Sequence, residues 1–346
     1  MLCDKLIDIK VYRTALMESS TTEENSIKES KVCSKCHKEQ AKVHITPLIY
    51  CNNCFMENAF HKFKTTVRTK LRIWKDDACL VCVDGGVGSM CMLDLLKRCI
   101  SESTRKKIFL NITVIHIDES AIYPSNPSLV KEFCVKHNFN YIIVPLEYIF
   151  CLEEFLLPTE IADTQVTIIK RVPKSQRKAK SPEEEKAPSF AAPESQILTS
   201  SEELKMKLNN FISCFSVQSK HEIVTYLKKW MLIYFAQKYK FTKIFLAHNA
   251  NALAAHLFQL TISGRGQNMA SDADYADGRY RGMMFVRVLK DFLDKEIFYY
   301  AFLNNIKGIQ KKYHEDFNDP ILPSKGSNEI VIKSFLNELQ VFLINL

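Results

Sequence analysis

Three short, β-branched apolar segments lie in the first half of the sequence, and a glycine-rich turn follows the first of them. They cover residues 79–83, 112–117 and 141–144, and a fourth at 243–247 follows a long helical pattern over 222–240. Strands that are apolar on both faces are typical of a parallel sheet covered by helices. An amphipathic helix is expected from Ser89 to Ser101, which completes a strand–turn–helix–strand unit. The sequence therefore predicts an α/β fold with a doubly wound, mainly parallel sheet.

The bulk composition is that of a soluble globular protein. The chain has 346 residues, of which 47% are hydrophobic and 25% charged, enough for one large domain with appendages. Residues 1–20 lack a secretory pattern, and no run approaches the roughly 20 apolar residues of a membrane span. Twelve cysteines then indicate a reducing compartment, so we expect a cytoplasmic protein without membrane association. The formal net charge of +8 favours an anionic partner.

Changes in composition divide the chain into segments. Inside the main domain, residues 172–206 carry four prolines, a run of three glutamates and many lysines and serines. Such a stretch buries too little apolar surface to order itself, so we expect a disordered insertion there. The predicted parts are a mobile tail at 1–30, a zinc ribbon at 31–57, a basic connecting helix at 58–77, the α/β domain at 78–305 and a helical extension at 306–346.

Four cysteines in the predicted ribbon have metal-ligand spacing. Cys33, Cys36, Cys51 and Cys54 form the pattern C-x2-C-x14-C-x2-C, in which each pair fits on a tight turn with both sulfurs pointing one way. Two such turns on a hairpin supply four thiolates to a tetrahedral zinc ion. Because four thiolates leave no open coordination position, the zinc is predicted to be structural. The alternatives are His37 or His44 as substitute ligands, or free thiols that share this spacing by chance.

Two other cysteine features are predicted to be structural. Cys79 and Cys82 also have C-x2-C spacing, but they lie in a predicted strand, where residues three apart point to opposite faces. We therefore expect core thiols. Cys214 stands alone in its region, and a lone cysteine is more often a core residue than a nucleophile, although Lys220 and His221 are near enough in sequence to lower its pKa.

A basic stretch follows the ribbon. Between residues 58 and 75 there is no acidic residue, and aromatic residues are interleaved with the cations. A basic helix of this kind can follow a nucleic-acid backbone. The alternative is a solvated helix face whose aromatic residues pack inward. The predicted nucleic-acid-binding residues are Lys62, Lys64, Arg68, Lys70 and Arg72.

The glycine turn at residues 84–89 reads DGGVGS. It is neither a Walker loop, because no lysine follows the glycines, nor a G-x-G-x-x-G loop. It most resembles the S-G-G-x-D-S loop of the N-type ATP pyrophosphatases, whose amides and hydroxyls hold the pyrophosphate released during adenylation. Gly85, Gly86 and Ser89 keep the turn and one hydroxyl. Asp84 replaces a serine, and two like charges ~4 Å apart cost about 4 kcal/mol at an effective dielectric near 20.

Further motifs occur in the order found in one branch of that family, the proteins that thiolate the wobble uridine of tRNA. The resemblance covers roughly residues 31–150 and 210–305. It implies a PP-loop-like fold, a tRNA substrate, a catalytic paralogue as partner and a ubiquitin-related modifier as sulfur donor. It also places His248 in the wall of the nucleotide site. The motifs are NAFHKFKTTVRTK after the cysteines, HIDE at 116–119, AHNANALA at 247–254, SGRG at 263–266, RVLKD at 287–291 and KEI at 295–297.

The sequence departs from the catalytic members at several positions. Gly88 stands where they carry an aspartate, and Asn251 and Ala252 replace an acidic pair. The region of Cys214 has no second cysteine, and the C-terminal zinc ribbon of relatives is missing. The resemblance therefore implies a non-catalytic subunit, and binding of ATP is left open. Two alternatives remain: an active ATP-dependent tRNA-modifying enzyme that tolerates the altered loop, and a zinc-ribbon RNA-binding module without a role in thiolation.

Overall fold

A computed structural model describes most of the predicted ribbon and α/β domain. The predicted tail at 1–30 lies outside the described residues, as does most of the extension at 306–346. The structure describes residues 32–45, 47–71, 73, 77–101, 110–123, 127–152, 192–280, 282–308, 332 and 335.

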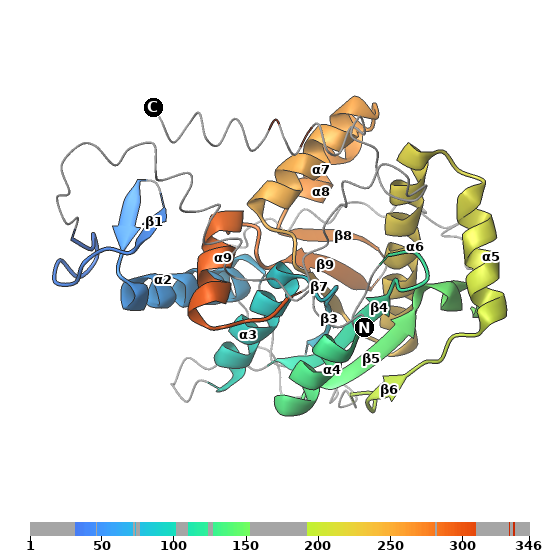
Figure 1. The fold of residues 1–346 in the computed structure, drawn as a ribbon, viewed down its shortest axis with the longest axis horizontal. Coiled ribbons are helices and arrows are strands. Elements are labelled where there is room, and N and C mark those ends of the chain that lie inside the picture. The colour runs from blue at the N-terminus through green and yellow to red at the C-terminus, as the bar shows by residue number, and fades with distance from the viewer. Residues whose placement is uncertain are drawn as a thin grey trace, which may run out of the picture.

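A seven-stranded sheet forms the centre of the α/β domain (Figure 1), with strand order β6-β5-β4-β3-β7-β9-β8. Strand β8 is antiparallel to β9, and every other neighbouring pair is parallel, which confirms the predicted mainly parallel sheet. The chain runs from β3 outward to β6 and then returns to place β7 on the other side of β3. The strands are β3 (Ala78–Cys82), β4 (Asn111–Asp118), β5 (Asn140–Pro145), β6 (Gln196–Ile197), β7 (Lys243–Leu246), β8 (Ala276–Tyr280) and β9 (Met283–Arg287).

Helices cover both faces of this sheet because the central strands are apolar on both sides. Along β3, Cys79 and Val81 join one buried cluster, whereas Ala78 and Leu80 join the other. The first cluster includes α3 (Val87–Ser101), α4 (Pro127–Lys136) and α9 (Asp294–Leu303); the second includes the short η3 (Leu146–Cys151), α5 (Glu202–Ser213) and α6 (Val217–Lys238). The link between β7 and β8 contains α7 (Ala250–Ile262), η5 (Gly266–Asn268) and α8 (Met269–Ala273).

Part of the predicted disordered insertion is ordered, which corrects the expectation for residues 172–206. Residues 172–191 lie outside the described part of the chain, but β6 pairs with β5, with Gln196 opposite Ile142. Helix α5 begins at Glu202, where the Ser201 side chain accepts a hydrogen bond from the Leu204 amide at 3.3 Å. Composition alone missed this order because backbone pairing with β5 and a local helix cap supply it.

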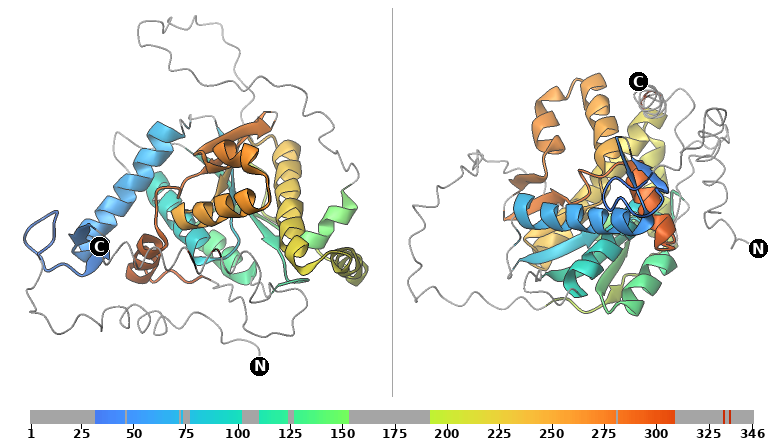
Figure 2. Two further views of the ribbon diagram at one scale, coloured as in Figure 1. Left: turned by 90° about the horizontal axis from the view of Figure 1, so that it is seen from above. Right: turned by 90° about the vertical axis from the view of Figure 1, so that its left-hand side faces the viewer.

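The N-terminal module is a hairpin followed by a helix. Strands β1 (Val43–Ile45) and β2 (Leu48–Tyr50) pair antiparallel, as predicted for the ribbon. Helix α2 (Asn52–Thr65) begins within the cysteine pattern and continues into the π-helical turn η2 (Thr66–Lys70). The boundary expected between residues 57 and 58 therefore falls inside α2. Two views show α2 beside α9, with the hairpin at the opposite end of the molecule from α5 (Figures 1 and 2).

Contacts between α2 and the C-terminal part of the domain join the ribbon to the main fold. The rings of Phe55 and Tyr299 meet edge to face with centroids 6.2 Å apart. The Lys62 Nζ donates to both carboxylate oxygens of Glu296 at 2.8 and 2.9 Å, and only 7% of the Glu296 side chain is exposed. Glu296 also accepts from the Leu293 amide at 2.8 Å, which fixes the first turn of α9. The ribbon is thus part of the same buried cluster as α3 and α9.

Replacing Lys62 with Met tests this connection. The change leaves the Glu296 carboxylate without its cation, so we expect the free energy of unfolding to fall by about 2 kcal/mol, below the full cost of breaking a buried pair because Lys62 is partly exposed. Urea denaturation measures the loss. Lys205→Met is the matched control, since the partner of Lys205, Glu202, is 83% exposed and the change should leave stability unaltered. Equal effects of the two changes would contradict a structural role for the Lys62–Glu296 pair.

Candidate functional site

The four predicted metal ligands converge on one point. The sulfur atoms of Cys33, Cys36, Cys51 and Cys54 all lie within 4.8 Å of one another, and the Cys36 and Cys51 sulfurs are 4.0 Å apart. All except Cys36 are buried. His37 and His44, the alternative ligands, are not part of this group among the described residues. A tetrahedral ion with bonds of about 2.3 Å holds its sulfur ligands at this spacing, so the donor set fits a single bound metal.

The backbone around the first cysteine pair prepares it to bind a cation. Burial opposes ionisation of Cys33, but backbone amides of Cys36, Cys51 and Lys35 more than offset this and lower the pKa of its thiol to about 6. For Cys54, burial together with the neighbouring cysteine side chains raises the pKa to about 12. One thiolate is therefore available at neutral pH before a metal arrives. Backbone amides of Glu39 and Lys38 also lower the pKa of Cys36, whereas the pKa values of Cys51 and Cys54 are raised. A metal that binds all four sulfurs displaces the protons that remain.

The glycine loop between β3 and α3 is closed by its own aspartate. Gly85 has φ of 80°, a left-handed conformation that favours glycine, and it turns the chain back toward the sheet. The Asp84 Oδ1 then accepts from the Gly86 amide at 3.0 Å and from the Ser89 hydroxyl, which also lies 3.0 Å from the Gly86 carbonyl. An amide and a hydroxyl that a phosphate would need are thus bound to a carboxylate. Asp84 therefore opposes phosphate binding in two ways. Its negative charge repels a phosphate, and its oxygen already occupies the donors of the loop.

Two further contacts hold this loop in place. His116, which is 1% exposed, lies with Nδ1 2.7 Å from the Val83 carbonyl, so Nδ1 is the protonated nitrogen. On the other side, a β-carbon at Gly308 would come within 2.7 Å of the Val87 backbone at the start of α3. Only glycine permits this approach, and it places the chain after α9 directly on the helix terminus that faces the loop. The sequence alone revealed neither contact.

The loop lies at the carboxyl edge of the sheet where the strand order reverses, between β3 and β7. In open α/β sheets this is the position at which ligands bind. A side chain at Gly88 would point toward the Ala247 carbonyl just after β7, 3.8 Å away. The next residue, His248, is exposed to solvent, and the surrounding protein together with the positive charge of Arg287 lowers the pKa of its imidazole. His248 is therefore neutral at pH 7 and faces the same edge as Asp84.

Other residues of this motif have structural partners. The Asn249 side chain caps α7 by accepting from the Ala252 amide at 2.9 Å and also bonds Asp294. Arg287, 5% exposed at the end of β9, donates to the Asp274 carbonyl at 2.8 Å, and its Nε has no hydrogen-bond partner in the described structure. Burial is the main cause that lowers the pKa of this guanidinium.

The predicted basic track divides into inward and outward residues. Lys62 is paired with Glu296, as described above, and Lys64 lies with its Nζ 5.8 Å from the Phe60 ring centroid. Arg68 and Lys70 are exposed on η2, and Arg72 lies outside the described residues. The helix therefore presents some of its cations to solvent while others pack on the protein. Their contacts with tRNA stay a prediction.

The remaining cysteines behave differently from one another. Cys79 is buried in β3, and burial raises the pKa of its thiol to about 12, as expected for a core residue. Cys82, at the end of the same strand, is half-buried and is not part of a metal-ligand group. Cys214 was expected in the core, and this expectation is wrong: it is exposed at the end of α5, with its sulfur 3.3 Å from the Asn210 carbonyl. The helix ends there, so residue 214 no longer lies on the buried face formed by Leu208 and Ile212.

Comparisons with known proteins agree with this arrangement. No protein-family model matches the chain. The chain is 26% identical over 332 residues to cytoplasmic tRNA 2-thiolation protein 2 of Danio rerio, which covers 90% of this chain and 64% of the relative. Its identity to the proteins of the same name is 30% in Dictyostelium discoideum, over 73% of this chain and 42% of the relative, and 22% in Xenopus tropicalis, over 96% and 68%. The chain thus spans about two thirds or less of the length of these relatives.

Among solved structures, the U34-tRNA thiolase NcsA from Methanococcus maripaludis with its [4Fe-4S] cluster has a similar fold. The TM-score is 0.56 with 14% identity, over 89% of this chain and 82% of that one. The sheet, the glycine loop and this likeness define a PP-loop-like α/β protein with an N-terminal cysteine ribbon. The relatives narrow the likeness further: in sequence the chain is similar to cytoplasmic tRNA 2-thiolation protein 2 of several species. Among the described residues, no helix is both long and apolar enough to span a membrane.

Cys51→Ser tests the metal centre. Loss of one of four thiolates should release the metal and unfold the hairpin, because the ligands are part of its small core. Elemental analysis of the purified protein should find metal in the unchanged chain and little in the variant. Cys214→Ser, which alters an exposed cysteine outside the cluster, should keep its metal. A normal metal content in the Cys51 variant would rule out this ligand set.

Asp84→Ser tests the occupied loop. The change frees the Gly86 amide and removes a negative charge, so we expect the variant to bind pyrophosphate, measured by titration calorimetry, where the unchanged chain gives no heat. Asp84→Asn is the matched control because it removes the charge but keeps an oxygen for the Gly86 amide. It should bind more weakly than the serine variant. Equal affinity for pyrophosphate in all three proteins would show that Asp84 does not block the loop.

Proposed function

We propose that this chain is a non-catalytic subunit of the cytoplasmic complex that 2-thiolates the wobble uridine of the lysine, glutamine and glutamate tRNAs. It binds tRNA and supports a catalytic paralogue, tRNA 2-thiolation protein 1. The paralogue adenylates the uridine with ATP, and a ubiquitin-related modifier delivers the sulfur to the complex. The names of the relatives suggest this role and the cytoplasmic location, and the likeness to a U34-tRNA thiolase agrees with both.

The observation that carries the non-catalytic part of the proposal is the position of the Asp84 carboxylate. It accepts from the Gly86 amide and the Ser89 hydroxyl, so an incoming triphosphate meets a like charge and bound donors. Gly308 covers the start of α3 in addition. In the sequence, Gly88, Asn251 and Ala252 stand where the catalytic members carry acidic groups. The chain keeps the backbone of an adenylating site without its chemistry.

For the metal we propose zinc rather than an iron–sulfur cluster. In a four-iron cluster each cysteine binds a different iron, so the cluster body separates the sulfurs. Here all four sulfurs lie within 4.8 Å, a spacing suited to one tetrahedral ion. When bound, the zinc would hold the hairpin and the start of α2 in place. The proposed zinc is bound by the N-terminal cysteines alone. The [4Fe-4S] cluster belongs to NcsA and is not proposed for this site.

For tRNA we propose that the outward cations of α2 and η2 contact phosphates. Arg68 and Lys70 are exposed and make no ion pair with the residues that the structure describes, and Lys64 is half-buried one helical turn before Arg68. Lys62 serves chiefly to hold α9 through Glu296. Such contacts position RNA without reading its sequence. Recognition of the wobble uridine itself then falls to the catalytic paralogue.

Deletion of the gene tests the role in thiolation. Mass spectrometry of tRNA nucleosides should show that wobble 2-thiouridine disappears and that expression of the full chain restores it. The Asp84→Ala chain should restore it equally, because no catalytic group is lost. Unchanged 2-thiouridine in the deletion would select the alternative, an RNA-binding module with no part in thiolation. Failure of the Asp84→Ala chain alone would show that Asp84 has an active role.

Lys64→Glu combined with Arg68→Glu tests the phosphate contacts. If both cations bind phosphates, tRNA affinity should fall, and the slope of log affinity against log salt should become shallower by about 1.5. Filter binding at several salt concentrations measures both quantities. Lys238→Glu combined with Lys240→Glu, two exposed lysines at and just after the end of α6, is the charge-matched control for non-specific repulsion. An unchanged salt slope in the double variant would reject the contact.

A further inference from the structure

One aromatic ring beside the basic track has an unusual set of neighbours. Tyr275 immediately precedes β8 and is half-buried. The Lys70 Nζ lies 5.3 Å and the Lys290 Nζ 4.3 Å from its ring centroid, although the two lysines come from η2 and from the turn after β9. Cations at these distances are attracted to the ring face. Two segments far apart in sequence thus direct positive charge at one half-buried aromatic ring.

The ring is held in a fixed orientation. Its hydroxyl donates to Asp291 Oδ1 at 2.6 Å, and the other oxygen of this carboxylate accepts from Thr66 Oγ1 at 3.1 Å. Burial and the Asp291 carboxylate raise the pKa of Tyr275 to about 12, so the phenol keeps its proton at pH 7. The Tyr275 carbonyl accepts from the Arg287 amide at 2.8 Å. An oriented ring loses little freedom when a flat ligand stacks on it.

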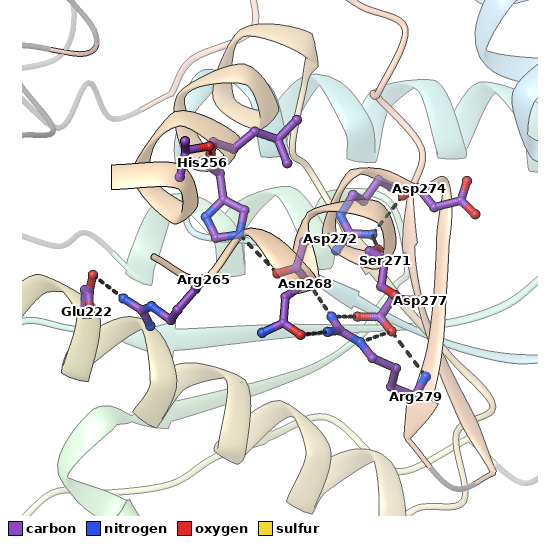
Figure 3. A network of polar contacts seen from close by, with 12 residues as sticks. Glu222, His256, Arg265, Asn268, Ser271, Asp272, Asp274, Asp277 and Arg279 are labelled. Atoms are coloured by element: carbon purple, nitrogen blue, oxygen red, sulfur yellow. Dashed lines mark hydrogen bonds and ion pairs between the residues drawn. The ribbon is translucent and has the colours of Figure 1, made fainter. Parts of the chain in front are cut away.

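The segment before Tyr275 is fixed by a network of ion pairs (Figure 3). Arg279 binds Asp272 and Asp277, and its Nε lies 2.9 Å from Asp277 Oδ1. His256 Nε2 lies 3.6 Å from the other Asp272 oxygen. Burial alone would raise the pKa of Asp272, but its contacts with His256 and Arg279 lower it below the usual range. The acids of this network are therefore bound by their own partners.

The cations near the ring have no acidic partner in the described part of the chain. Lys70 and Lys290 make only their ring contacts, and Arg68, two residues before Lys70, is exposed without an ion pair. Asp291 is close, but it is bound by two hydroxyls and pairs with neither lysine. Arg287, which holds the backbone of Tyr275, also acts on the charge of His248 at the carboxyl edge.

We infer that Tyr275 is a stacking platform for an unpaired nucleobase of RNA, with Arg68, Lys70 and Lys290 binding the flanking phosphates. Exposed cation–π contacts are weaker than the stacking of a base on an aromatic side chain. When RNA arrives, the base therefore replaces the ammonium groups on the ring, and these groups turn to the phosphates. The inference rests on the proposed tRNA binding and adds to it a residue that holds a single-stranded nucleotide.

Fluorescence measurements on the full chain test the platform. The probe is an unmodified anticodon stem-loop RNA that carries 2-aminopurine in the loop. We expect Tyr275→Leu to raise Kd about tenfold, as for the loss of one base stack, and to abolish quenching of the 2-aminopurine. Tyr275→Phe keeps the ring and should retain quenching and affinity within about twofold. Thermal melting establishes that each variant is folded.

A second pair of variants tests the cations independently. Lys70→Gln with Lys290→Gln should make the salt slope shallower by about 1.4, the value for two contacts to single-stranded phosphates. Lys238→Gln is the control, because its Nζ also lies near aromatic rings, 5.8 Å from Tyr234 and 5.7 Å from Tyr239, at the end of α6. This control should bind RNA as the unchanged chain does.

The outcomes separate this inference from the proposed function. If the unchanged chain binds RNA, but Tyr275→Leu quenches normally or the double lysine variant keeps its salt slope, the platform is wrong and the proposed function stands. If the unchanged chain binds no RNA, the proposed tRNA contact fails and the platform fails with it. Should Tyr275→Leu not fold, the double lysine variant and Tyr275→Phe decide the matter.

Discussion

The hydrogen bonds of the Asp84 carboxylate with the Gly86 amide and the Ser89 hydroxyl determine what the carboxyl edge of the sheet can do. The parallel strands bring the glycine loop, His248 and Arg287 to the position where an α/β sheet binds its ligand. At that position the loop already holds an anion that belongs to the protein itself. The same backbone that would bind a phosphate is thereby stabilised without one.

A second set of contacts links the cysteine ribbon to this loop. The ribbon leads into α2, and Lys62 binds Glu296 in the first turn of α9. After α9 the chain passes over the start of α3, where Gly308 meets Val87 at a distance that only glycine allows. A metal bound to the ribbon would therefore stabilise the positions of α2, α9 and the glycine loop together. The outward cations of η2 lie beside the ring of Tyr275.

Local pattern was enough to predict the sheet, its mainly parallel character and the grouping of the four cysteines, because each is encoded within a few neighbouring residues. The sequence shows that the loop residues are altered. It does not show that the Asp84 carboxylate bonds to the Gly86 amide and the Ser89 hydroxyl, because those contacts depend on backbone geometry. The Lys62–Glu296 pair joins residues 234 positions apart, and composition cannot show which cations of a basic helix turn inward. Tyr275 could not be identified as a site residue from the sequence either, because the lysines near its ring come from other segments of the chain. Order at residues 196–206 was missed because the strand there depends on its neighbour, β5.

We propose that this chain carries RNA beside a partner and does not itself use ATP. The most direct test incubates the purified full-length chain, without its paralogue, with Mg-ATP and unmodified tRNA and measures the release of pyrophosphate. We predict no release above that of a tRNA-only control, because the donors of the loop are bound to Asp84. Release that depends on both ATP and tRNA and is lost in an Asp84→Ala variant would contradict the claim, since the carboxylate would then be part of a working site.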